Sequence, residues 1–195
     1  MIESVKYNLS NLTNFEGRDA RQTFWFYVLF LIILQFVASL IVSIPMMVGM
    51  FQGAFEAARS GADPQQLNAA MFEQLEGSLK TQIWISVILG VLSVLLFVAA
   101  FVRRLHDSGK PGWLALLAIG PYLAALAINV SSFDKIMAST REAMTATDPN
   151  QAMAMQSELY AYSILPWIGY LVVIAFGVMK SDEGPNKYGE APVRF

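Results

Sequence analysis

The sequence predicts an all-α membrane protein with four transmembrane helices and helical loops on the outer side. Composition is the first reason, because 55% of the 195 residues are apolar and only 14% are charged, against about 45–50% and about 25% in soluble domains. The second reason is that four stretches contain no Asp, Glu, Lys or Arg, and each is long enough to cross a hydrocarbon core of roughly 30 Å. The third is that these stretches lack the polar face that a helix of a soluble bundle presents to water.

The charge-free stretches set the limits of the expected spans. They run from Phe24 to Phe55, Thr81 to Val102, Pro111 to Phe133 and Leu159 to Met179. We expect transmembrane helices at about 24–50, 83–102, 113–131 and 160–179, in a single domain over residues 1–195 that ends in a tail at 180–195. The first apolar run is too long for a cleavable signal peptide, so we expect it to remain as a membrane anchor.

Lys and Arg are distributed unequally between the two sides of this topology. Nine of them lie before the first span, between spans two and three, and after span four, whereas four lie in the other two loops. Cytoplasmic loops carry the excess of Lys and Arg in membrane proteins. The sequence therefore predicts that both termini and the loop at 103–112 face the cytoplasm.

The two outer loops each contain an Asp-Pro pair that is typical of a helix start, at Asp63-Pro64 and at Asp148-Pro149. Asp accepts hydrogen bonds from free N–H groups at a helix N-cap, and Pro fits the first helical position. Good helix formers follow both pairs. We expect both outer loops to be helical, either lying on the membrane surface or extending the next span outward.

Several classes of function are disfavoured by what the chain lacks. It has no cysteine and one histidine, His106, so one chain cannot build a thiolate or multi-imidazole metal site. Its net charge of -2 does not suit nucleic-acid binding, and no ionisable residue lies at membrane depth, as ion-coupled transport usually requires. We expect no metal, no cofactor and no nucleic-acid partner. Methionines of the outer loops are read as apolar packing rather than as copper ligands.

Three polar segments meet at the predicted cytoplasmic side. Residues 15–25 read Phe-Glu-Gly-Arg-Asp-Ala-Arg-Gln-Thr-Phe-Trp, residues 103–113 read Arg-Arg-Leu-His-Asp-Ser-Gly-Lys-Pro-Gly-Trp, and residues 181–192 are rich in turn formers. Arg18, Arg21 and Trp25 share one helical face, with the indole at interface depth. Gly109 suits a helix C-cap, and Pro111 ends the helix before the next span begins at Trp113.

These motifs resemble a known family. The Gly-Arg-x-x-Arg-x-x-Phe-Trp segment, the Arg-Arg-Leu-His-Asp-x-Gly-Lys-x-Gly-Trp loop and the Gly-x-Asn-x-Tyr-Gly-x-x-Pro tail are similar to the bacterial inner-membrane family catalogued as domain of unknown function 805. The resemblance covers almost the whole chain. It implies a small multi-pass protein of the bacterial inner membrane, and it supplies no reaction.

The convergence of cations predicts a binding site for anionic lipid or a protein partner. Forked guanidinium hydrogen bonds suit phosphate groups, whereas the simpler explanation is that these cations set topology and touch anionic lipid. Asn186 and Tyr188 are expected to hold the tail against the basic loop. A second copy of the chain or another membrane protein is the alternative partner. The predicted binding residues are Arg18, Arg21, Arg103, Arg104, Lys110, Trp113, Asn186 and Tyr188.

Two other functions remain open from the sequence. One is an enzyme acting on a phosphorylated lipid, with His106 and Asp107 as an acid–base pair, although adjacent residues in a turn often point apart. The other is a channel or transporter for a small solute, lined by the polar residues of the spans: Gln35, Ser86, Ser93 and Asn129. We favour the non-enzymatic binding module, because no nucleophile elbow, carboxylate pair or metal-ligand spacing accompanies His106.

Overall fold

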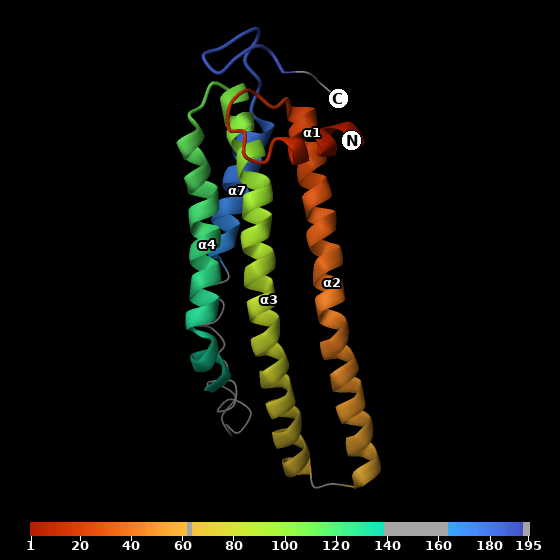
Figure 1. The fold of residues 1–195 in the computed structure, drawn as a ribbon. Coiled ribbons are helices and arrows are strands. Elements are labelled where there is room, and N and C mark those ends of the chain that lie inside the picture. Colours follow the sequence, from red (N-terminus) through yellow and green to blue (C-terminus); the bar gives the residue numbers. More distant parts are fainter. Residues whose placement is uncertain (62–63, 139–163, 193–195) are drawn as a thin grey trace.

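A computed structural model describes residues 1–61, 64–138 and 164–192, and these segments are almost entirely helical. A short helix α1 (Ile2–Ser10) precedes two long antiparallel helices, α2 (Arg21–Ser60) and α3 (Pro64–Asp107). The 3-10 turn η1 (Gly112–Ala115) leads into α4 (Leu116–Ser131), and α7 (Leu165–Val178) precedes the tail. Helices α4 and α7 lie beside α3, and α1 lies across the end of the bundle where the tail also folds (Figure 1).

Three of the helices are long and apolar enough to cross a membrane, over Arg21–Gly53, Glu76–Asp107 and Gly112–Ser131. They correspond to the first three predicted spans. The fourth prediction, 160–179, corresponds to α7, a shorter apolar helix whose 14 described residues extend about 21 Å at 1.5 Å per residue. Residues 160–163 lie outside the described part of the chain. The all-α class is confirmed for the described residues, which contain three long apolar helices and a shorter one.

The first outer loop is smaller than expected. The predicted span ends near residue 50, but α2 continues to Ser60, because residues 54–59 are strong helix formers apart from Phe55. Gly61, with a φ of 60°, ends the helix in the left-handed conformation that glycine adopts without strain. Pro64 is the first residue of α3, as predicted, so residues 64–80 extend the following span. Asp63 and the pair Asp148-Pro149 lie outside the described residues.

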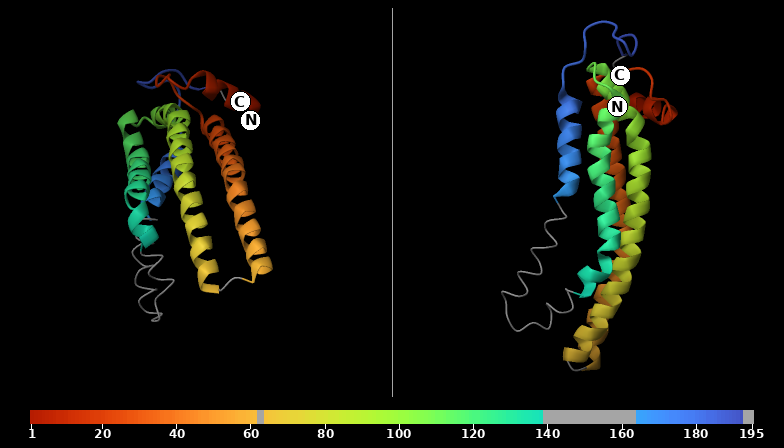
Figure 2. Two further views of the ribbon diagram at one scale, coloured as in Figure 1. Left: turned by 60° about the horizontal axis from the view of Figure 1, so that its bottom comes forward. Right: turned by 90° about the vertical axis from the view of Figure 1, so that its left-hand side faces the viewer.

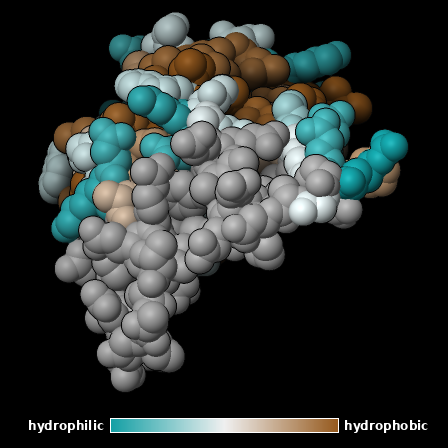
Figure 3. All heavy atoms as spheres, turned by 90° about the horizontal axis from the view of Figure 1, so that it is seen from below, coloured by the Kyte–Doolittle hydropathy of each residue, from teal (hydrophilic) through white to brown (hydrophobic). Residues whose placement is uncertain are grey.

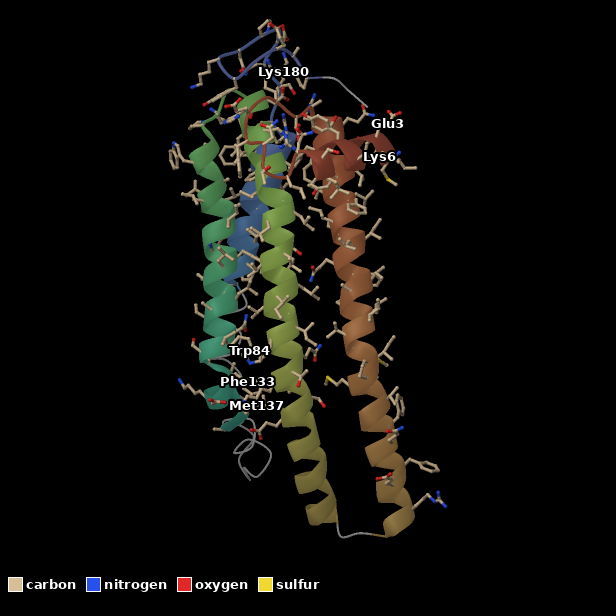
Figure 4. The ribbon with its side chains drawn as sticks, in the orientation of Figure 1. Glu3, Lys6, Trp84, Phe133, Met137 and Lys180 are labelled. Carbon is tan, nitrogen blue, oxygen red and sulfur yellow. The ribbon has the colours of Figure 1, made fainter. Side chains whose placement is uncertain are left out.

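The side-chain core lies towards the end that carries both α1 and the tail. Phe24 and Tyr27 of α2 pack there with Phe101 and Leu105 of α3, all fully buried. Further along the bundle the large apolar side chains are mostly exposed, as expected for helices that face lipid. Polar side-chain atoms gather at the end that carries Glu3, Lys6 and Lys180 (Figure 4).

Helix α7 runs beside α4 (Figure 2), and two of its glycines allow it to approach its neighbours closely. A Cβ atom at Gly169 would lie 2.5 Å from the backbone oxygen of Ala118 on α4, and one at Gly177 would lie 2.7 Å from the Trp25 ring on α2. The Trp25 indole N–H also donates to the Gly177 carbonyl at 3.1 Å. Helix α7 is therefore held to α4 near its start and to α2 near its end.

The opposite end of the bundle carries both apolar and charged side chains on its surface, such as the exposed Phe55 and Arg59 of α2. Trp84, Phe133 and Met137 lie in this half of the bundle (Figure 4), and Phe133 and Met137, which follow α4, are buried. Seen from this end, hydrophobic residues lie along one side of the molecule and hydrophilic residues lie at the edges of the view (Figure 3).

Candidate functional site

The three sequence motifs come together at one end of the bundle in what we call the cap, made of residues 11–20, 103–111 and 179–192. Helix α3 ends at Asp107, and the N–H groups of Ser108, Gly109 and Lys110 donate to the carbonyls of Leu105 and His106. Gly109 has a φ of 68°, which fits the predicted C-cap. A Cβ there would lie 2.7 Å from the Asp182 carboxylate, so this glycine also lets the tail approach the turn.

Arg18 joins all three segments of the cap. Its Nε and Nη2 atoms donate to Asp107 Oδ1 at 3.1 and 3.0 Å, and the ion pair is fully buried. The remaining donors go to tail carbonyls, with Nη1 bonding Gly184 at 2.6 Å and Gly189 at 3.3 Å and Nη2 bonding Asp182 at 2.9 Å. Every N–H of this guanidinium therefore has an acceptor within the protein.

Arg104 ties the end of α3 to the end of α7. Its Nη1 atom donates to Asp107 Oδ2, its Nε to the Gly177 carbonyl at 3.1 Å, and its Nη2 to the Met179 carbonyl. The hydroxyl of Ser181 donates to the same Asp107 oxygen. Asp107 thus accepts from two buried arginines and from the tail, which offsets much of the cost of burying its charge.

Arg103 holds α1 and the loop that follows it. Its Nε donates to Asp19 Oδ1 at 3.0 Å and its Nη2 to Asn8 Oδ1 at 2.6 Å. Its Nη1 donates to the backbone carbonyls of Asn11 and Asn14. The Arg103–Asp19 pair is fully buried, and burial raises the pKa of the Asp19 carboxyl, although the adjacent guanidinium opposes that shift.

His106 and Asp107 contact different partners. The imidazole stacks on the Tyr188 ring at a centroid distance of 3.9 Å and an angle of 4°, and its Nδ1 lies 3.3 Å from the Gly17 carbonyl. The Asp107 carboxylate, by contrast, faces Arg18 and Arg104. The two residues point apart, as expected of neighbours in a turn, and the acid–base hypothesis gains no support from this arrangement.

The tail docks on the turn after α3, as the sequence predicted for Asn186 and Tyr188. The Asn186 amide donates to the His106 carbonyl at 2.9 Å, and Asn186 pairs with Gly189 through two backbone hydrogen bonds of 3.0 Å. The Tyr188 ring lies flat on His106. These contacts, together with the carbonyls that bind Arg18, fasten the tail to the rest of the cap.

The predicted binding residues divide into three groups. Arg18, Arg103 and Arg104 are buried and bonded within the cap. Arg21 is exposed at the first position of α2, Lys110 is half-buried, and Trp113 is 62% exposed. Asn186 and Tyr188 are half-buried where the tail docks on the turn after α3. The structure therefore brings the three arginines together in the interior and leaves Arg21, Lys110 and Trp113 nearer the surface.

Sequence reasoning missed two acceptors, Asp19 and Asn8, which bind Arg103. Asp19 adjoins Arg18 in the first motif, and an acidic residue within a basic motif was the signal that could have found it. No comparable signal marks Asn8 or the backbone carbonyls, because their role depends on how the segments fold together.

A polar cavity of about 650 Å³ lies between the start of α2 and the tail. Arg21, Lys180, Asp182 and Glu183 are among its lining residues, and Lys180 pairs with Glu183 at 2.6 Å. The charges of these four side chains balance. Among the residues that the structure describes, no group of three or more His, Cys, Asp or Glu side chains is placed to hold a metal ion.

Comparison with known proteins identifies a family. A family model described as "Protein of unknown function (DUF805)" matches residues 12–190. Two curated relatives, both called "Inner membrane protein YhaH", from Escherichia coli strain K12 and from Escherichia coli O157:H7, are each 32% identical over 122 residues, which cover 63% of this chain and 77% of the relative. No solved structure matches the chain. Because the family model matches most of the chain, including the three motifs, the protein belongs to the DUF805 family of integral membrane proteins of unknown function.

Proposed function

We propose that the protein is a non-enzymatic module of the bacterial inner membrane that binds anionic lipid headgroups on its cytoplasmic face. The observation that carries this proposal is that some cations at this end of the bundle are buried and bonded within the protein, whereas others are exposed. Buried arginines hold three chain segments together, and exposed cations remain around them at the helix ends. The inner-membrane location is supported by the name of the relatives, "Inner membrane protein YhaH", and by the apolar helices.

The binding surface in this proposal is a set of cations around the cap that we call the rim: Lys6, Arg21, Lys110, Lys180 and Lys187. All of them are exposed except Lys110, which is half-buried. Cations held at the cytoplasmic surface attract anionic lipid by about 1 kcal/mol each. Trp113, at the start of η1, is suited to the level of the headgroups.

The buried arginines act indirectly in this proposal. The hydrogen bonds of Arg18 use all of its donors, and those of Arg103 and Arg104 also end on protein acceptors. A headgroup phosphate would have to displace these partners to reach them. Their role is to position the rim, with Asn186 and Tyr188 keeping the tail in place.

The proposed topology has four spans and both termini in the cytoplasm. The absence of cysteine allows single cysteines to be introduced at exposed positions, with Glu190→Cys in the tail and Glu56→Cys near the end of α2. In intact inverted and right-side-out vesicles, we expect an impermeant thiol reagent to label the tail only from the cytoplasmic side and position 56 only from the other side. Labelling of both positions from the same side contradicts this topology.

Lipid binding is tested by native mass spectrometry of the protein extracted with phosphatidylglycerol and phosphatidylcholine. The test variant carries Arg21→Gln, Lys110→Gln and Lys187→Gln. The matched control is Arg59→Gln, an exposed cation at the far end of α2. Loss of three surface cations is expected to weaken retention of phosphatidylglycerol by about two orders of magnitude, since each cation contributes about 1 kcal/mol.

The control should retain phosphatidylglycerol as the parent does. Equal retention by the triple variant and the control would refute the proposal. Loss of a second polypeptide, instead of lipid, from the triple variant would show that the rim binds a protein partner. An Arg103→Glu, Arg104→Glu variant is unsuitable for this purpose, because it places two carboxylates among buried acceptors and disrupts the cap itself.

A further inference from the structure

A cavity of about 540 Å³ lies between α2, α3, α4 and α7, among the apolar parts of these helices. Its volume is within the range of small-molecule sites. Gln35 lies fourteen residues beyond Arg21 along α2, which is about 21 Å at 1.5 Å per residue. The cavity therefore reaches deep into the span, far from the cap.

The cavity follows from the way α7 is held. Gly169 brings α7 against α4, and Gly177 brings it against α2 only near the cap. Further from the cap, α2 leans away from α4 (Figure 1). Ile32 and Phe36 of α2 line the resulting space and are exposed, so the cavity is open to the surrounding lipid on this side.

The lining is apolar except for a few neutral hydrogen-bonding groups: Gln35, Ser39, Ser93, Tyr122 and Tyr170. No Asp, Glu, Lys, Arg or His is among the residues that line it. A charged occupant would find no counter-charge there, and burying an unpaired charge costs a great deal of free energy. The occupant that matches this lining is electrically neutral.

Gln35 and Tyr122 lack a complete set of hydrogen bonds among the described residues. Ser93 Oγ lies 2.8 Å from Gln35 Oε1 and 2.8 Å from the Leu89 carbonyl. Whichever contact the single hydroxyl proton serves, the other end of the Gln35 amide has no partner among the described residues. The hydroxyl of Tyr122 also has no hydrogen-bond partner among the described residues. Hydrocarbon chains cannot satisfy such groups, and leaving them unsatisfied at membrane depth is costly.

The aromatic lining adds a preference for a flat group. Phe36, Phe97, Tyr122 and Tyr170 line the cavity from four different helices, and aromatic faces pack well on planar conjugated or ester groups. An occupant that offers a carbonyl to Gln35 or Tyr122, together with a hydrocarbon chain, meets both the polar and the apolar requirements.

We propose that this cavity binds a neutral lipid that carries a carbonyl group, with the carbonyl accepting a hydrogen bond from Gln35 or Tyr122 and the chain lying between α2 and α7. Prenyl quinones and diacylglycerols both have this chemistry. The site is separate from the rim of the cap and takes a ligand of different charge.

The test measures binding of decylubiquinone and of dioctanoylglycerol to the full chain in nanodiscs of phosphatidylcholine, which contain no anionic lipid. Retention is followed by native mass spectrometry, with squalene as a hydrocarbon probe that has no carbonyl. The parent should bind at least one of the two carbonyl probes in a saturable manner and should not retain squalene.

The variants are Gln35→Leu, which removes the amide, and Tyr122→Phe, which keeps the ring and removes the hydroxyl. Each should weaken binding of the carbonyl probe about tenfold, and the double variant more. Asn129→Leu is the matched control, because it removes an amide that bonds the Ala125 carbonyl and does not line the cavity. Ile32→Trp, which fills the cavity, should exclude both probes.

The binding results distinguish the two classes of carbonyl lipid. Binding of decylubiquinone alone assigns the site to quinones, and binding of dioctanoylglycerol alone assigns it to acylglycerols. The proposal is overturned if neither probe binds, if squalene binds as well as they do, or if both Gln35→Leu and Tyr122→Phe bind like the Asn129→Leu control. The triple variant of the rim should bind the carbonyl probes normally, which distinguishes failure of this site from failure of the lipid-headgroup surface.

Discussion

Arg18 and Asp107, separated by 89 positions in the sequence, form a buried ion pair in which the guanidinium donates twice to one carboxylate oxygen. Arg18 precedes α2 and Asp107 ends α3, so the pair connects the start of one of the two longest helices to the end of the other. The same arginine binds three carbonyls of the tail. The conformation of the tail is therefore coupled to the packing of the spans.

Removal of this arginine should destabilise the protein. In Arg18→Gln the Asp107 carboxylate loses one of its two cationic partners and remains buried, a change that typically costs about 3–5 kcal/mol. We expect a clearly lower melting temperature in detergent, measured by scanning fluorimetry. Lys180→Gln is the control, since the Lys180–Glu183 pair is largely exposed and such pairs contribute little. Equal melting temperatures for the two variants would contradict the buried-pair assignment.

The stack of His106 on Tyr188 should control how firmly the tail is docked. Tyr188→Ala removes the ring, and aromatic pairs contribute about 0.5–1.5 kcal/mol beyond their buried area. Hydrogen exchange of residues 181–190 should become several-fold faster in this variant. Tyr188→Phe preserves the stacked ring and should exchange like the parent, so fast exchange in Tyr188→Phe would argue against stacking as the cause.

Substitution by alanine should affect the melting temperature differently at Gly169 and at Gly120. At Gly169 a Cβ would lie 2.5 Å from the Ala118 backbone oxygen, whereas at Gly120 no atom lies within 4 Å. Gly169→Ala forces α7 away from α4 and should lower the melting temperature. Gly120→Ala should leave it unchanged or raise it, because alanine is favoured over glycine in helices by about 1 kcal/mol. A stabilised Gly169→Ala variant would refute the close approach of α4 and α7.

Asp19 should make stability depend on pH with a definite sign. Its pKa in the folded protein is raised above the ordinary value of 3.8, chiefly by burial. The folded state then holds this proton more tightly than the unfolded state does. Protonation of Asp19 therefore stabilises the folded state. This stabilisation is fully present below the pKa of Asp19 in the unfolded chain and is lost as pH rises through its pKa in the folded protein.

The comparison that isolates this effect is between the parent and Asp19→Asn, which cannot titrate at this position. As pH falls from 7 towards 4, the melting temperature of the parent should rise relative to that of Asp19→Asn. A relative fall of the parent over the same interval would mean that the ion pair with Arg103 outweighs desolvation and that the folded pKa is depressed.

Much of the fold follows from local sequence. Runs of about 20 residues without charge can only be accommodated as apolar helices, so the approximate positions of α2, α3 and α4 were predictable. Pro64 marked the start of α3, because proline fixes φ at a helical value, and Gly109 marked its C-cap, because glycine adopts the left-handed conformation that ends a helix. Both effects act within one turn of helix. The extension of α2 to Ser60 was missed, since hydropathy marks where apolar character ends and not where the helix ends.

The sequence alone determined a helical membrane protein with three polar segments at one end, because span length, charge depletion and turn residues are local properties. Only the tertiary structure decided which cations are internal. Arg18 and Arg21 share one short motif, yet Arg18 is buried against Asp107 and Arg21 is exposed, because burial depends on what the other segments place beside each side chain. The cavity beside Gln35 is likewise a product of the relative tilt of α2, α4 and α7, which depends on packing contacts between residues far apart in the chain.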